Sequence, residues 1–258
     1  MSFDITSPLN KIYPINPWII IPEPRPQARL RLLCLPYGGV GSAIYFPWNK
    51  YLPKNIELCL IRLPGRETRL KETPFTRLLP LVEELAQALA PFLDRPFAVF
   101  GHSMGALIGF EFMHYQQDLS SRTATHLFVS GRRAAQLPDP NPPLHKLPDL
   151  DLVKEVQSRY NGIPKVILQD DELLQLFLPT LRADIELIET YCFQGTRLDI
   201  PISAFSGRDD VMVSEIDVAS WGELTLKKFR MRIFPGDHFY LQNHPDMVIQ
   251  EIVTDLSM

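Results

Sequence analysis

The residues with the clearest potential for chemistry form the sequence Gly-His-Ser-Met-Gly at positions 101–105, in which a serine stands between two glycines. An apolar stretch at residues 97–100 precedes this sequence, and small and apolar residues follow it at 106–110. This order predicts a strand that turns sharply into a helix, with Ser103 at the turn. Glycine suits both flanking positions, because the strand and the helix approach closely and the residue between them adopts strained dihedral angles. We therefore interpret Ser103 as a nucleophile whose Oγ is exposed to a substrate.

A serine hydroxyl acts as a nucleophile at neutral pH when a histidine accepts its proton and a carboxylate orients that histidine. With the serine at such a strand-to-helix turn, the acid and then the histidine follow it along the chain. His238 lies directly beyond the last expected strand, where a loop can place its imidazole over the serine. His244 lies at the start of the closing helix, a position typical of a helix cap or an exposed residue. We therefore predict His238 as the base.

The acid is expected after the strand that precedes the last one, where Gly-Arg-Asp-Asp at residues 207–210 offers two carboxylates. Strand alternation cannot separate adjacent loop residues, so the residues alone leave both Asp209 and Asp210 open. Asp209 has the alternative role of an exposed turn residue that pairs with Arg208 or accepts a backbone hydrogen bond. Asp237 is a weaker candidate, since a residue adjacent to His238 is badly placed to accept a hydrogen bond from its ring.

The attacked carbonyl also needs hydrogen-bond donors for the negative charge that develops on its oxygen. The backbone N–H of Met104, the residue after the nucleophile, is one predicted donor. The second is expected in the glycine-rich loop Pro-Tyr-Gly-Gly-Val-Gly-Ser at residues 36–42, and we assign it to the N–H of Gly38. This loop lacks both the Gly-x-Gly-x-x-Gly spacing and the Gly-Lys-Ser/Thr ending of phosphate-binding loops.

Strand-like and helix-like segments alternate along the chain, which predicts an α/β fold with a mainly parallel sheet and crossover helices. Between residues 136 and 195 a proline-rich stretch leads into helical patterns without a strand, which predicts a helical lid. We expect a single domain, with its core at about residues 28–135 and 196–258 and the lid insertion at about 136–195. Besides the strand before Ser103, the expected strands are 31–35, 56–61, 125–130, 202–206 and 226–234, and the expected helices include 78–93 and 245–256.

Composition excludes several classes of function. The 258 residues are 45% hydrophobic and can bury a large core, and a net charge of −4 indicates no basic surface for nucleic acid. The N-terminal residues do not resemble a secretion signal, and no apolar run is long enough to span a bilayer, so we expect a cytoplasmic protein. Cys34, Cys59 and Cys192 have neither the count nor the spacing of a disulfide framework or a metal site.

Taken together, these motifs resemble those of the type II thioesterases that accompany nonribosomal peptide and polyketide synthases, within the α/β-hydrolase superfamily. The resemblance covers nearly the whole chain. Its most specific parts are Pro-Gly-Arg at residues 64–66 and Leu-Arg-Ala-Asp at residues 181–184, whereas Gly-His-Ser-Met-Gly is shared with many hydrolases. The chain departs from the family pattern at Gly38, where alanine is usual, and at Asp237, where glycine is frequent.

The resemblance implies an α/β-hydrolase fold with a mobile helical lid, a triad of Ser103, Asp210 and His238, and an oxyanion hole built from the N–H groups of Gly38 and Met104. It also implies hydrolysis of stalled or misprimed acyl groups from the phosphopantetheine arm of acyl or peptidyl carrier protein domains, through an acyl-enzyme intermediate. Because that arm belongs to the carrier, the chain is expected to need no cofactor or metal of its own. The family is generally monomeric.

Two other classes of function stay open at this point. One is a general carboxylesterase or an acyltransferase of the same superfamily, and the other is a non-catalytic binding protein, against which the complete triad argues. A cluster of cations also suggests a hypothesis, that Arg62, Arg66, Arg69 and Lys71 help to dock an acidic carrier. The alternative is that Arg66 holds its own loop in place and the other cations are solvated. Asp184 and Tyr191 are interpreted as structural residues of the lid or pocket floor.

Overall fold

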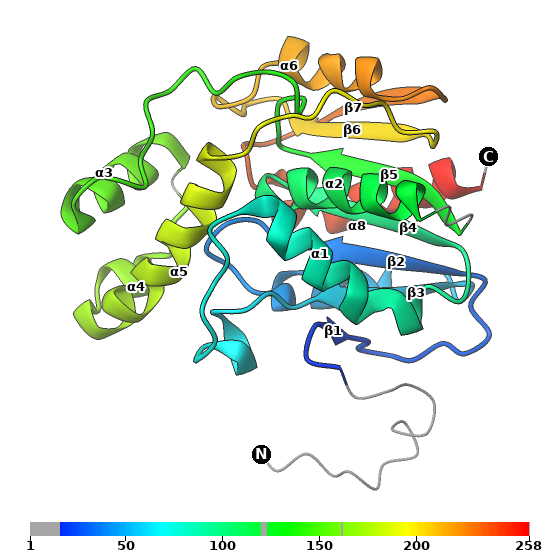
Figure 1. The fold of residues 1–258 in the computed structure, drawn as a ribbon, viewed down its shortest axis with the longest axis horizontal. Helices are drawn as coiled ribbons and strands as arrows, with labels where there is room; N and C mark the ends of the chain where they lie inside the picture. The colour runs from blue at the N-terminus through cyan, green and yellow to red at the C-terminus, as the bar shows by residue number, and fades with distance from the viewer. Residues whose placement is uncertain (1–15, 120–122, 161, 258) are drawn as a thin grey trace, which may run out of the picture.

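The computed structural model describes residues 16–119, 123–160 and 162–257, which form a sheet of seven strands flanked by helices (Figure 1). The strand order is β1-β3-β2-β4-β5-β6-β7. Neighbouring strands run parallel, except that β1 pairs antiparallel with β3 at one edge. The strands are β1 (Ile19–Ile20), β2 (Leu30–Leu35), β3 (Ile56–Ile61), β4 (Phe97–His102), β5 (Ala124–Ser130), β6 (Ile202–Gly207) and β7 (Phe229–Phe234).

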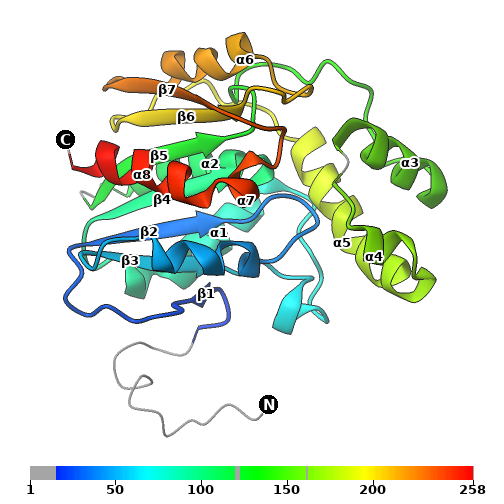
Figure 2. The ribbon, with the colours of Figure 1, turned by 180° about the vertical axis from the view of Figure 1, so that it is seen from behind.

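Helices cover both faces of the sheet. On the face seen in Figure 1 lie α1 (Leu78–Leu89) and α2 (Met104–Asp118), and on the opposite face, seen in Figure 2, lie η2 (Ser42–Lys50), α7 (Tyr240–Asn243) and α8 (Pro245–Leu256). Helix α6 (Glu215–Ala219) lies near β6 and β7. A parallel sheet that is covered on both faces explains the nearly continuous apolar strands in the sequence.

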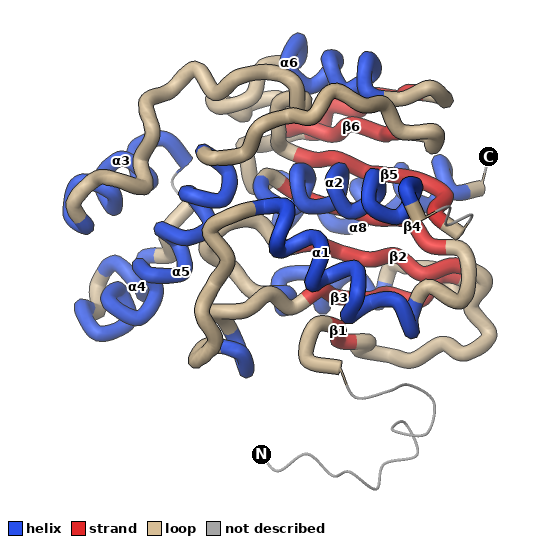
Figure 3. The backbone as a smooth tube through the Cα atoms, viewed as in Figure 1, coloured by secondary structure: helices blue, strands red, loops and turns tan. Residues whose placement is uncertain are grey.

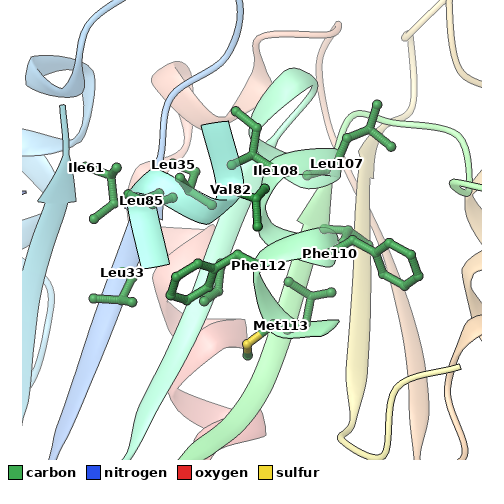
Figure 4. Packing of buried hydrophobic residues seen from close by; sticks show 14 of the residues in the cluster. Leu33, Leu35, Ile61, Val82, Leu85, Leu107, Ile108, Phe110, Phe112 and Met113 are labelled. Carbon is green, nitrogen blue, oxygen red and sulfur yellow. The ribbon is translucent and has the colours of Figure 1, made fainter. Parts of the chain in front are cut away.

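The alternation of side chains along β2 divides the core into two layers. Leu33 and Leu35 point toward α1 and α2, where they join Val82 and Leu85 in the larger apolar cluster (Figure 4). The alternate residues of the strand, Leu32 and Cys34, belong to the second cluster, under η2 and α8. Burying each such leucine contributes about 1.5–3 kcal/mol relative to an exposed position, so the two layers hold the sheet rigid beneath the loops at its edge.

The described residues between 136 and 195 form helices and loops without a strand (Figure 3). The helices are α3 (Asp149–Tyr160), α4 (Lys165–Leu168) and α5 (Asp171–Glu189), and they lie beyond one end of the sheet (Figure 1). We call this segment the lid. It has a small apolar cluster of its own, separate from the two core layers, which includes Leu152, Val156 and Leu181. The lid is therefore packed partly on itself.

The expected elements differ from the observed ones mainly at their ends. Strand β3 and helix α8 have the expected bounds, whereas α1 ends at Leu89 and continues only as a short 3-10 turn over Ala90–Phe92. Pro91 explains this end, because its ring blocks further α-helix. Strand β7 begins at Phe229, three residues later than expected. The short strand β1 was not predicted, since a two-residue edge strand in a proline-rich arm has no periodic signal.

Two further observations concern the described residues. None of their helices combines the length and apolarity that a membrane crossing requires. Cys34 and Cys59 lie buried in β2 and β3, Cys192 is exposed, and all of them are free thiols.

Candidate active site

Ser103 occupies the turn between β4 and α2 in a strained backbone conformation, with φ of 50° and ψ of −111°. The flanking glycines are required by space: a Cβ at Gly101 would lie 2.0 Å from the carbonyl oxygen of Gly105. A Cβ at Gly105 would lie 2.5 Å from the carbonyl oxygen of Leu35. The N–H of Ser103 donates to the carbonyl of Ser130 at 2.8 Å, which ties the turn to the end of β5. The close packing and this hydrogen bond maintain the strained turn, which places the serine at the edge of the sheet.

The loops after β6 and β7 bring Asp210 and His238 together. Asp210 Oδ2 accepts a hydrogen bond from His238 Nδ1 at 2.7 Å, and Asp210 Oδ1 accepts one from the backbone N–H of Met212 at 2.9 Å. The Asp210 side chain is fully buried and that of His238 is 8% exposed. A carboxylate that holds Nδ1–H leaves Nε2 unprotonated, so His238 presents the tautomer that a general base needs.

The other candidates for these roles lie elsewhere. Asp209 is exposed, and its N–H donates to the carbonyl of Gly236. Asp237 is also exposed, and its Oδ1 accepts from the N–H of Phe239. His244 stands at the start of α8, where its side chain makes no capping hydrogen bond. Asp210 is thus the carboxylate that contacts His238.

Ser103 and His238 line the same cavity, which is partly open to solvent. Residues of the lid close one side of this cavity, among them Tyr160, Ile163 and Leu181. Within the described residues, no hydrogen bond joins Ser103 Oγ to His238. Such bonds are often long in the absence of substrate and tighten when it binds. The cavity is suited to an acyl chain because apolar side chains line much of its wall.

Two backbone N–H groups are candidates for the oxyanion hole. Met104 is the first residue of α2, so its N–H has no partner within the helix. Gly38 lines the cavity, and its neighbour Gly39 donates its N–H to Asp184 Oδ2 at 2.7 Å. Since the Gly39 amide is already engaged, Gly38 is the glycine of this pair whose N–H can serve a substrate oxygen.

A buried network lies beneath the base. The ring of His102 lies 4.8 Å from that of His238, centroid to centroid, and His102 Nδ1 hydrogen-bonds Ser130 Oγ at 2.8 Å. Ser130 Oγ in turn hydrogen-bonds the hydroxyl of Tyr240 at 2.6 Å. Burial lowers the pKa of His102 well below its ordinary value, with the nearby His238 acting in the same direction. His102 is therefore a neutral support for His238 at neutral pH, a role that was not predicted from the sequence.

Arg132 is a second residue of the site that was not predicted from the sequence. It follows β5 closely and lines the cavity together with Ser103 and His238. Its Nε is buried, and within the described part of the chain this nitrogen has no hydrogen-bond partner. Burial lowers the pKa of Arg132, against the opposing effect of Asp139. Its place just after a parallel strand, at the same edge as Ser103, could have identified it as a residue of the site.

The docking hypothesis for the cation cluster is wrong for two of its members. Arg66 is buried and pairs with Asp184, and Arg69 is buried, pairs with Glu72 and stacks over the Trp18 ring. A buried and paired guanidinium cannot present its charge to a partner. The alternative that Arg66 holds its own loop is correct, since it also donates to the carbonyls of Pro64 and Val40.

Tyr191 joins the end of the lid to the core. Its hydroxyl donates to Glu111 Oε1 at 2.5 Å, and Glu111 is largely buried in α2. This contact is consistent with the expected structural role. Among the described residues, no group of three or more His, Cys, Asp or Glu side chains is arranged to hold a metal ion.

Known proteins share both the sequence pattern and the geometry of this chain. A family model described as "Thioesterase domain" matches residues 30–256. The gramicidin S biosynthesis protein GrsT of Aneurinibacillus migulanus is 41% identical over 228 residues, which cover 88% of this chain and 89% of GrsT. Thioesterase PikA5 of Streptomyces venezuelae is 34% identical over 242 residues, or 93% of this chain and 84% of PikA5. The structure of BorB, a type II thioesterase of the borrelidin biosynthetic cluster, superposes with a TM-score of 0.83 at 31% identity, covering 95% of this chain and 98% of BorB.

Proposed function

This chain belongs to the thioesterase family, and we propose that it uses Ser103, His238 and Asp210 to hydrolyse acyl groups held as thioesters on carrier proteins. The family match confirms the resemblance to type II thioesterases, and the superposition confirms the expected α/β-hydrolase fold. The chain is therefore a thioester hydrolase. The observation that carries the proposed chemistry is the 2.7 Å contact between Asp210 and His238 in the cavity wall that also contains Ser103.

The reaction proceeds in two halves. His238 Nε2 accepts the proton of Ser103 as its Oγ attacks the thioester carbonyl, and the N–H groups of Gly38 and Met104 stabilise the oxyanion. The C–S bond then breaks, the thiol leaves with the proton from His238, and the acyl group stays on Ser103. A water molecule gives a proton to the same ring and attacks the acyl-enzyme; the ester bond to Ser103 Oγ then breaks, and this oxygen takes the proton back from His238. The products are the free acid and regenerated Ser103.

The carrier as substrate is supported by the names of the relatives. GrsT belongs to gramicidin S biosynthesis, and BorB is a type II thioesterase of a biosynthetic cluster. We propose by this similarity that an acyl or peptidyl carrier domain of a synthase presents the thioester, and that the enzyme removes stalled or misprimed chains. Three side chains and two backbone N–H groups suffice for the reaction, so we also propose that the chain needs no cofactor of its own. The monomeric state and the cytoplasmic location stay predictions from the sequence.

The experiment that tests this function compares three kinds of substrate with the same acyl group. Acyl-phosphopantetheinyl carrier proteins, acyl-CoA and p-nitrophenyl esters are incubated with the protein or with Ser103→Ala, and the acid released is measured by mass spectrometry. Faster release from carriers, abolished by Ser103→Ala, is the expected result. Cleavage of esters without turnover of carriers would instead indicate a general carboxylesterase. Transfer of the acyl group to an added alcohol or amine would indicate an acyltransferase.

A further inference from the structure

One side chain of the lid reaches the loop that carries the oxyanion donor. Asp184, in the second half of α5, is 3% exposed, and its Oδ2 accepts the N–H of Gly39 at 2.7 Å. The same carboxylate accepts two hydrogen bonds from Arg66. Nη1 donates to Oδ2 at 2.9 Å, and Nη2 donates to Oδ1 at 2.7 Å. Each oxygen of Asp184 therefore has a donor, and the carboxylate joins a lid helix to two loops of the core.

Arg66 makes further contacts along the glycine-rich loop at residues 36–42, which we call the oxyanion loop. Its Nη1 also donates to the carbonyl of Val40 at 3.1 Å, and its Nε lies 3.3 Å from the carbonyl of Pro64. The loop is thus held at Gly39 by the carboxylate and at Val40 by the guanidinium. Arg66 is 7% exposed, so the pair is shielded from water and salt. In such surroundings neither partner can be removed without leaving a buried charge unpaired.

The position of these bonds matters because Gly38 and Gly39 have no side chains with which to fix their own conformation. Gly39 has a φ of +77°, and a Cβ there would lie 2.9 Å from the Phe177 ring. The N–H that Asp184 holds belongs to the peptide unit joining Gly38 to Gly39, directly after the predicted oxyanion donor. Fixing this unit limits how far the Gly38 N–H can rotate away from the position of the substrate oxygen.

On the basis of the proposed function, we propose that Asp184 and Arg66 are positioning residues of the oxyanion hole. Through them, the geometry of the hole depends on whether α5 is packed against the core. The lid then contributes to the chemical step as well as to the wall of the cavity. When α5 is seated, Asp184 holds the Gly39 amide and the Gly38 N–H points into the site. When α5 moves away, the loop loses the one side-chain acceptor that the described residues provide for Gly39.

The lid helix offers a matched control for this proposal. Glu186, two residues beyond Asp184 on α5, pairs with Arg77 at 2.6 Å and so also joins the lid to the core. This pair is more exposed, and it does not touch the oxyanion loop. Asp184→Asn and Glu186→Gln each remove one carboxylate charge from α5 without a change in size. Only the first alters the contact with Gly39 and Arg66.

The test measures the chemical step and binding separately. We expect Asp184→Asn to lower kcat for thioester hydrolysis roughly 10- to 100-fold with KM changed less than about threefold, because a displaced oxyanion donor acts in the transition state. Affinity for an alkyl trifluoromethyl ketone, whose adduct with Ser103 carries an oxyanion, should fall by a similar factor. Glu186→Gln should change both quantities less than about twofold.

Arg66→Lys provides a second variant if Asp184→Asn does not fold, as judged by circular dichroism. Lysine keeps the charge but cannot contact both carboxylate oxygens and two carbonyls at once, so it should show the same kcat and ketone defects. Equal losses in Asp184→Asn and Glu186→Gln, or a loss confined to KM, would overturn the proposal. So would full activity of both Asp184→Asn and Arg66→Lys. A wild-type protein without Ser103-dependent thioester cleavage would instead refute the proposed function.

Discussion

Replacing Asp210 by asparagine should nearly abolish catalysis while preserving the fold. Asp210 uses both of its oxygens, Oδ1 for the fixed N–H of Met212 and Oδ2 for His238 Nδ1. Asparagine has one carbonyl oxygen, and the backbone donor of Met212 cannot move away from it. The amide NH₂ group of the introduced side chain, which is not an acceptor, would therefore face the histidine. His238 then has to carry its proton on Nε2, where it cannot accept the proton of Ser103.

The size of the effect follows from this exchange of tautomers. Loss of the base function in a serine triad with unchanged geometry lowers kcat by about 10,000-fold, or about 5.5 kcal/mol in the activation free energy. The free energy of unfolding should change far less, by about 1 kcal/mol or below, because the replaced atoms are isosteric and still hydrogen-bonded. The activation free energy should thus rise by several kcal/mol more than the free energy of unfolding falls.

The assay is the rate of acyl-CoA or p-nitrophenyl ester hydrolysis, read together with urea unfolding of the same samples. Asp209→Asn and Asp237→Asn are the matched controls, because both residues are exposed and neither carboxylate hydrogen-bonds the His238 ring. Each should retain activity within about threefold of the wild type. Asp210→Asn with more than a tenth of wild-type kcat, or an equal loss in Asp209→Asn, would refute the assignment of the acid.

Three further outcomes are expected. Gly38→Ala should keep its activity and stability, since the new Cβ would meet Asp184 Cβ at an ordinary 3.6 Å. Gly105→Ala should lose about 2 kcal/mol or more of unfolding free energy, because its Cβ would lie 2.5 Å from a backbone oxygen. Urea titrations of both variants check this difference, and equal stability would contradict it. Burial lowers the pKa of His126 from 6.5 to about 4, so the unfolded chain binds more protons and stability should fall as the pH drops from 6.5 toward 4. At pH 5 the protonation of this residue in the unfolded chain should lower the free energy of unfolding by about 2 kcal/mol. A His126→Gln variant whose unfolding free energy has the same pH slope as the wild type would disprove the linkage. Arg132→Met should raise the melting temperature, because it removes a buried Nε–H group that has no hydrogen-bond partner among the described residues. A lower melting temperature in calorimetry would show that the guanidinium is stabilising.

The elements of the core could be predicted because their signals are local. Strand β3 and helix α8 have the expected bounds, since apolar runs, helical periodicity and Pro245 at the helix start are read within a dozen residues. The sharp turn at Ser103 could be expected for the same reason, from two glycines at fixed spacing. Strand β1 could not, because its two residues depend on pairing with β3, some forty positions along the chain.

The choice among loop residues was open in the sequence for a different reason. Asp209 and Asp210 are neighbours with the same chemistry, and only the hydrogen bond between Asp210 and His238, 28 positions apart, distinguishes them in space. The cation cluster shows the opposite case, in which residues close in sequence do not form one surface. Four basic residues close in sequence suggested one surface, but packing buries Arg66 and Arg69 against carboxylates.

The amino-acid pattern was thus enough to predict the fold class, the strained serine turn and the order of the loops that reach the same edge of the sheet. Each of these depends on residue types at short spacing, where backbone sterics and side-chain periodicity act directly. Other features required the folded chain: Asp184 holds the oxyanion loop together with Arg66, 118 positions away, and the buried Nε of Arg132 has no hydrogen-bond partner among the described residues. Such contacts depend on how the lid packs on the core, because burial and pairing of charges arise only when distant segments meet.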